Sequence, residues 1–198
     1  MELYYVVIFA TLINAFWWIV YMKDTLEWKT KPNKVTWWIW TVAPLIWSAA
    51  MCYSQWLSWN ILPVFMAWFV PLLVFIASFV NPKSYWKLNK LDYICLASAI
   101  LALVLWWITK NPLLAIIFWI LTDFFAAIPI IIKSYKFPET ETVFAFYTWF
   151  LSALSSFLVI KNWTIEEYLF PTYLVIICLV LILAYYWKKI LKLFSKIT

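Results

Sequence analysis

The stretch KTKPNKVTWWIW, residues 29–40, decides how the chain is divided. It places three lysines and a Lys-Pro step directly before three tryptophans. The stretch lies where one long apolar run, residues 3–22, gives way to the next, residues 35–54. A charged, proline-containing segment between two apolar runs predicts a polar hinge between two helices.

The composition predicts an integral membrane protein. Of the 198 residues, 67% are hydrophobic and 12% are charged, and the mean hydropathy is +0.89. A soluble domain is typically ~45–50% apolar and ~25% charged. No soluble fold of this size can bury so much apolar surface.

Seven runs with few or no charges follow one another along the chain. Each is close to the ~20 residues that cross a ~30 Å hydrocarbon core as a helix. The runs are continuous rather than alternating, which favours helices over a barrel. We therefore expect an all-α integral membrane fold of seven transmembrane helices, and we expect the first run to be retained because no basic leader precedes it. The runs are residues 3–22, 35–54, 61–80, 93–109, 112–132, 142–160 and 168–187.

The lysines predict the orientation in the membrane. Thirteen of the 15 lysines lie in the segments after the first, third, fifth and seventh runs, and only Lys110 and Lys161 lie in the other segments. The positive-inside rule then places the N-terminus outside and the C-terminus in the cytoplasm. This topology, together with attraction to anionic lipid headgroups, accounts for the net charge of +6 without a nucleic-acid partner.

The hinge recurs in KSYKFPETETVFAFYTW, residues 133–149, which again combines lysines, a proline and aromatic residues. At offsets of 106 to 109 residues, landmarks of the first three runs fall on landmarks of the last three. The small changes in offset fall in loops, where insertions are tolerated. The aligned pairs are Lys31-Pro32 with Phe137-Pro138, Thr36 with Thr142, Asn14 with Asp123, and Pro63 with Pro171.

The repeat divides the chain into four parts. Residues 1–82 form the first three-helix repeat, residues 83–110 the linker helix, residues 111–188 the second repeat, and residues 189–198 a basic cytoplasmic tail. One helix separates the two copies, so both have the same orientation. The sequence thus predicts two parallel three-helix bundles, an arrangement found among transporters.

In this arrangement the chain resembles the PQ-loop and SWEET superfamily, whose members have three helices, a linker helix and three more helices. The segment FAAIPIIIKSYKFPETETVFAF, residues 125–146, is similar to a PQ-loop motif in which Ile130 replaces the usual glutamine. The first copy departs further, with Val20 in the place of Pro129. The resemblance covers nearly the whole chain and is greatest to small bacterial membrane proteins. It implies a multi-pass protein of the bacterial inner membrane, with Pro129 and Pro44 as helix-kinking hinges.

The resemblance also implies transport of a small solute by alternating access between the two repeats. A reading from a different class is a membrane receptor, trafficking or scaffold protein that does not transport, because fold does not dictate function. The expected partners are a small-molecule solute and the lipid bilayer. Homo-oligomer formation is left open.

Asp123 is the one ionisable residue in the middle of a predicted span. A charge there costs at least ~2.5–3.5 kcal/mol, so the side chain is expected to face the bundle interior or a wet cavity. Asp123 and its repeat mate Asn14 are the candidate solute and proton site, with Asp123 as a proton carrier. The alternative for each is a hydrogen bond that holds neighbouring helices together.

Other chemistry is not predicted. The chain has no histidine and no glycine-rich phosphate loop, and its three cysteines lie within apolar runs. Without histidine, the usual Ser-His or Cys-His dyad cannot form. We expect no enzyme activity, no cofactor and no metal site.

The chain has no glycine and 17 tryptophans. At the average usage of ~7%, about 14 glycines would be expected. One hypothesis is that some tryptophans are glycines misread from UGA codons, with candidates at Trp28, Trp56, Trp59 and the pair Trp17-Trp18, which aligns with Ala126-Ala127. The alternative is a natural or redesigned protein that is genuinely rich in tryptophan.

Overall fold

A computed structural model of the chain describes residues 2–42, 45, 61–80, 87–109, 112–160 and 163–194. These residues are almost entirely helical and contain no strand, which confirms the all-helical prediction. Residues 34–42, which overlap the start of the predicted run 35–54, are also helical. The named elements are α1 (Glu2–Leu26), α3 (Ile61–Val80), α4 (Lys90–Thr109), α5 (Pro112–Lys136), α6 (Phe144–Ser156) and α7 (Ile165–Phe194), with 3-10 turns η2 (Pro138–Thr140) and η3 (Phe157–Val159).

Four of the described helices are long and apolar enough to cross a membrane. Their apolar stretches of 20 to 22 residues are Tyr5–Leu26, Lys90–Thr109, Ile116–Lys136 and Glu167–Lys188. At ~1.5 Å rise per residue, each covers the ~30 Å of a hydrocarbon core. α6 is shorter, with 13 residues, and η3 extends it by one turn.

Three helices run further than the apolar pattern predicts. α1, α5 and α7 continue to Leu26, Lys136 and Phe194, beyond the predicted ends at residues 22, 132 and 187. Their last turns carry lysines, which favour a helix C-terminus and can extend their heads toward water. Much of the predicted tail, residues 189–198, therefore continues α7.

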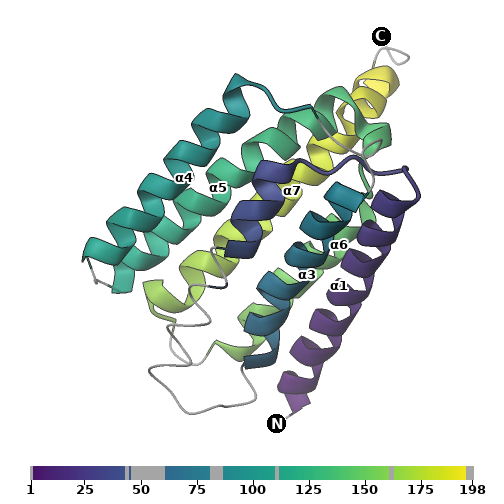
Figure 1. The fold of residues 1–198 in the computed structure, drawn as a ribbon. Coiled ribbons are helices and arrows are strands. Elements are labelled where there is room, and N and C mark those ends of the chain that lie inside the picture. Colours follow the sequence, from purple (N-terminus) through teal and green to yellow (C-terminus); the bar gives the residue numbers. More distant parts are fainter. Residues whose placement is uncertain are drawn as a thin grey trace.

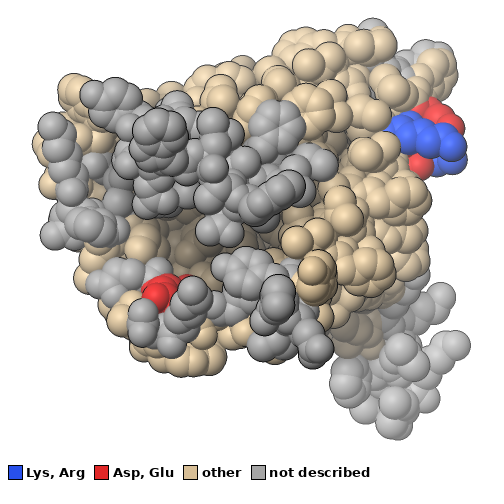
Figure 2. All heavy atoms as spheres, turned by 90° about the horizontal axis from the view of Figure 1, so that it is seen from below, with Lys and Arg blue, Asp and Glu red and all other residues tan. Residues whose placement is uncertain are grey.

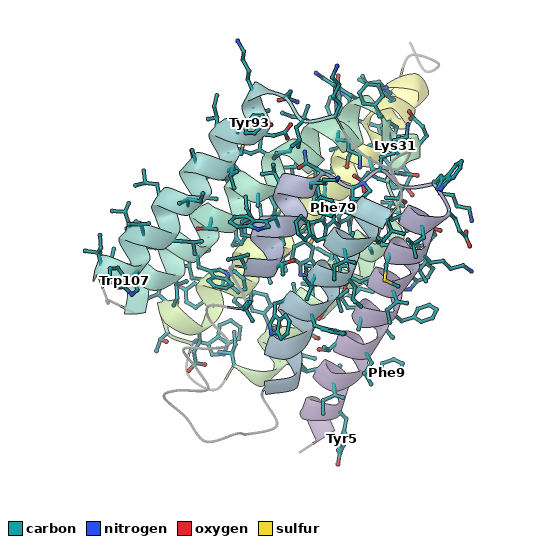
Figure 3. The ribbon with its side chains drawn as sticks, viewed as in Figure 1. Tyr5, Phe9, Lys31, Phe79, Tyr93 and Trp107 are labelled. Carbon is teal, nitrogen blue, oxygen red and sulfur yellow. The ribbon has the colours of Figure 1, made fainter. Side chains whose placement is uncertain are left out.

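The helices pack side by side in one bundle (Figure 1). α1 contacts α3 and α6, α5 contacts α4 and α7, and α6 also contacts α7. Ala126 and Ala127 of α5 are fully buried, and such small side chains let helices approach closely. The side chains on the outside of the bundle are largely apolar, as Tyr5, Phe9, Tyr93 and Trp107 show in Figure 3, and these four are 58–73% exposed.

Four tryptophans form an aromatic cluster between α1, α6 and residues 34–42. The ring of Trp18 lies 5.3 Å from that of Trp37 and 5.7 Å from that of Trp149. Trp40 contacts Trp149 at 5.2 Å. All three contacts are edge-to-face, the geometry that aromatic quadrupoles prefer. Trp18 therefore contributes its ring to this cluster, whereas Ala127, with which the sequence alignment pairs it, has no ring to contribute.

α1 ends in a turn that favours glycine. The backbone N–H of Lys29 donates to Asp24 O at 2.9 Å, and that of Trp28 donates to Thr25 O at 3.3 Å. This is the Schellman pattern, in which the residue after the cap is left-handed and usually glycine. Trp28 fills that place with φ of 72°, the one non-glycine residue of positive φ in the described part of the chain.

Candidate functional site

Asp123 is bonded to the neighbouring α7. The hydroxyl of Tyr173 donates to Asp123 Oδ2 at 2.6 Å, and the acid is half-buried. Aromatic rings continue from this contact, because Phe170 lies 6.2 Å from Tyr173 and 6.2 Å from Trp119 of α5. The acid thus lies at the α5–α7 contact beside aromatic side chains, where its hydrogen bond joins the two helices.

Asn14 is bonded to α6, in the other predicted repeat. The hydroxyl of Thr148 lies 3.3 Å from Asn14 Oδ1, 3.1 Å from Ala145 O and 3.3 Å from Phe144 O. A hydroxyl has a single hydrogen to donate, so these contacts share it and the bond to Asn14 is weak. The amide of Asn14 is half-buried and has capacity for a second partner.

The two predicted site residues have different partners. Asn14 lies on α1 and bonds α6, whereas Asp123 lies on α5 and bonds α7. Within the described ranges, no hydrogen bond joins Asn14 to Asp123. Any direct cooperation between them therefore requires a ligand or a change in packing.

Pro129 lies inside α5, and Pro44 lies outside the described residues. Proline has no N–H, so the helical bond to the carbonyl of Phe125 is missing at this point. The next carbonyl, Ala126 O, accepts a 2.6 Å hydrogen bond from the hydroxyl of Thr36. The weakest turn of α5 is therefore tied to the segment 34–42 of the other predicted repeat.

A buried ion pair lies at the second hinge. Lys133 of α5 and Glu141, which follows η2, form a salt bridge in which both side chains are 0% exposed. Lys133 Nζ also donates to the carbonyl of Lys31, and the hydroxyl of Tyr21 donates to the other oxygen of Glu141 at 2.7 Å. Lys31 lies at the upper end of the bundle in Figure 3.

A second set of hydrogen bonds joins the hinges beside this pair. The hydroxyl of Thr142 donates to Asp24 Oδ2 at 2.7 Å, and it lies 2.6 Å from the hydroxyl of Thr30. The backbone N–H of Lys31 donates to Thr140 O at 3.1 Å. The two hinges, which the sequence aligned as copies, are therefore in direct contact.

Sequence reasoning missed this contact. Lys133 counted only as one of the lysines that set the topology. Glu141 follows it by eight residues across a proline turn, which is a usable signal for an ion pair. Tyr21 is 120 residues from Glu141, and no sequence pattern links them.

The first hinge is also attached to α4. Asn33 Oδ1 accepts from the backbone N–H of Val35 at 3.0 Å and caps the helical segment 34–42. Its amide donates to Asp92 Oδ1 at 2.6 Å. Asp92 Oδ2 accepts in turn from the N–H of Asn89 at 2.7 Å, while Asn89 Oδ1 accepts from the N–H of Leu91 at 2.8 Å. The N–H of Asp92 also donates to Asn89 Oδ1 at 3.4 Å, so Asn89 and Asp92 bond reciprocally as a capping box for α4, and Asp92 links two helix starts.

The hinges thus contain one exposed ion pair and one buried ion pair. Glu27 and Lys29 form an exposed pair 2.7 Å apart, and the hydrogen bond from Lys29 lowers the pKa of Glu27. Such exposed pairs contribute little to stability. The side chains of Lys133 and Glu141 are shielded from solvent, so this pair depends on its protein partners.

Three buried polar side chains are unpartnered within the described part of the chain, and one of them is the hydroxyl of Ser134 in α5. The indole N–H groups of Trp37 and Trp40, both in the aromatic cluster, have no hydrogen-bond acceptor there. Buried polar groups normally have a partner, so these donors suit a water or a polar ligand. The described residues contain no group of three or more His, Cys, Asp or Glu placed to hold a metal.

Comparisons with protein-family models, with curated proteins and with solved structures found no match for this chain.

Proposed function

We propose that the chain is a small-solute membrane transporter of SWEET/PQ-loop type, in which two three-helix repeats alternate around a site between them. The proposal rests on one observation, which is the way the helices of the two repeats pack against each other. α1 contacts α3 of its own repeat and α6 of the other. α5 contacts α7 of its own repeat and, through Thr36, the segment 34–42 of the other. Each first helix thus has the same two kinds of neighbour, as a twofold pair of bundles requires.

The proposed orientation has the N-terminus outside and seven spans. In Figure 1 the ends of α1, α5 and α7 and the start of α4 lie at the end of the bundle that carries the C-terminus. These are the segments that hold the lysines. Figure 2 shows the opposite end, where few of the coloured side chains are charged. Because these lysine-rich segments lie at one end of the bundle, the positive-inside rule supports that end as the cytoplasmic side.

The proposed solute site lies among the helices that carry Asn14 and Asp123. Asn14 has hydrogen-bonding capacity to spare, and Asp123 can take up or release a proton when water reaches it. The unpartnered indoles of Trp37 and Trp40 add two donors. This combination suits a small polar solute and permits coupling to protons.

The alternative is a receptor, trafficking or scaffold protein. The aromatic cluster favours it, because four large rings fill the space between α1, α6 and residues 34–42. Close packing of this kind favours a bundle that does not open and close around a solute.

Uptake by reconstituted vesicles separates the two functions. The purified chain is assayed against a panel of sugars, amino acids and organic ions, with protein-free vesicles as the baseline. We expect at least one solute to enter faster than the baseline. A flat result over the whole panel, from protein that remains folded, would favour the non-transporting alternative.

A further inference from the structure

We propose that Lys133, Glu141 and Tyr21 form a latch that holds the two repeats together at the lysine-rich end of the bundle. The latch keeps the solute pathway closed on that side, so the inference rests on the proposed function. Lys133 and Glu141 belong to the second repeat, whereas Tyr21 and the Lys31 carbonyl belong to the first. Both contacts with the first repeat are hydrogen bonds to one buried ion pair.

Because the latch contains buried charges, it favours two states, one fully closed and one open to water. An ion pair removed from water is unfavourable unless its remaining donors and acceptors are satisfied. Glu141 uses one oxygen for Lys133 and the other for Tyr21, and Lys133 uses the Lys31 carbonyl as well. Separation of the repeats removes both outside partners at once. Water must then enter to replace them, so a half-open, dry arrangement is unfavourable.

Neighbouring contacts define the seam that the latch closes. The hydroxyls of Thr30 and Thr142 meet across it at 2.6 Å, and Thr142 also donates to Asp24. These groups are smaller and uncharged apart from Asp24. Pro129 lies one turn before Lys133 in α5, where the missing helical bond lets the last turn change direction.

The test measures exposure of the seam directly. Thr30, which is 1% exposed, is replaced by cysteine in a Cys52→Ala background, and the chain is reconstituted in vesicles. A charged thiol reagent then labels this cysteine only when the seam opens. The native Cys95 of α4 and Cys178 of α7, which are 2% and 0% exposed, report general unfolding in the same sample.

Glu141→Gln keeps the shape of the side chain and removes its charge. Because a hydrogen bond to a charged group is stronger than a neutral one, we expect the labelling rate at position 30 to rise about tenfold or more. Tyr21→Phe removes one bond and is expected to give a smaller rise. The matched control is Glu27→Gln, an exposed acid at the same end, which is expected to leave the rate unchanged. Cys95 and Cys178 are expected to stay protected throughout.

An unchanged rate in Glu141→Gln would overturn the latch, and so would an equal rise at Cys95 or Cys178, which would make Glu141 a residue needed for folding. The labelling needs no solute. A selective rise at position 30 without uptake of any solute would retain the opening and reject transport. Uptake with an unchanged labelling rate would retain transport and reject the latch.

Discussion

At the scale of single residues, Trp28 has a strained backbone, because it is the one non-glycine residue of the described chain with a positive φ. A left-handed conformation costs a residue with a β-carbon roughly 1–2 kcal/mol, and glycine avoids this cost at some loss of chain entropy. We expect Trp28→Gly to raise the free energy of unfolding by about 0.5–1 kcal/mol. Thermal unfolding in detergent measures the change.

The matched control is Trp187→Gly, because Trp187 is 43% exposed, close to the 52% of Trp28, but lies inside α7. Glycine inside a helix is destabilising by roughly 0.5–1 kcal/mol, so the two substitutions are expected to act in opposite directions. A loss of stability in Trp28→Gly would contradict the strain argument.

The coding sequence provides a separate test, since UGG codons at Trp17, Trp18, Trp28, Trp56 and Trp59 would reject the misreading hypothesis.

Asp123 provides a second prediction at this scale. Asp123→Asn keeps an acceptor for Tyr173 but removes the titration, so we expect folding to persist and accumulation driven by a pH gradient to be lost. Asn14→Ala is expected to weaken solute binding with a milder effect on coupling. Vesicle uptake with and without the gradient measures both, and Glu139→Gln, an exposed acid, is the control. An asparagine variant that still accumulates solute would leave Asp123 as a structural hydrogen bond.

At the scale of elements, the polar caps decide how helices begin. Asn33 caps the segment 34–42 and also donates to the buried Asp92, whereas Asn89 caps only α4. Loss of a cap costs ~1 kcal/mol, and a buried acceptor without its donor costs ~1–3 kcal/mol more. We therefore expect Asn33→Ala to destabilise the protein by about 2–4 kcal/mol and Asn89→Ala by about 1 kcal/mol. Denaturant unfolding in detergent gives both values, and the reverse order would show that Asp92 does not depend on Asn33.

At the scale of the whole molecule, the membrane topology is the main expectation to test. C-terminal reporter fusions after residues 30, 87 and 137 are expected in the cytoplasm, and fusions after residues 57, 111 and 164 outside. The lysine distribution sets this order. A reporter after residue 57 that stays cytoplasmic would break the seven-span scheme, while a fusion after residue 30 serves as the internal standard.

Within the described residues, the sequence by itself determined which segments are helical and where polar turns separate them. The predicted run 61–80 coincides with α3, and the polar part of the hinge, residues 29–33, lies between α1 and the helical segment 34–42. These features depend on local polarity, because an apolar run must satisfy its own backbone in a helix and a lysine-proline turn must end it. The apolar pattern did not predict the charged last turns of α1, α5 and α7, because each predicted run stopped at the first lysine. Lysine is tolerated at a helix end, so the helices continue beyond that point.

Only the tertiary structure decided which side chains meet. Tyr21 with Glu141, Thr148 with Asn14, and Tyr173 with Asp123 are contacts between different helices or across a hinge. In a soluble helix an apolar stripe indicates the face that packs inward. These helices are apolar on most sides, as is expected of helices that face lipid, so their sequences carry little information about rotation. Packing of small and aromatic side chains sets the rotation instead, and with it the partners of every buried polar group.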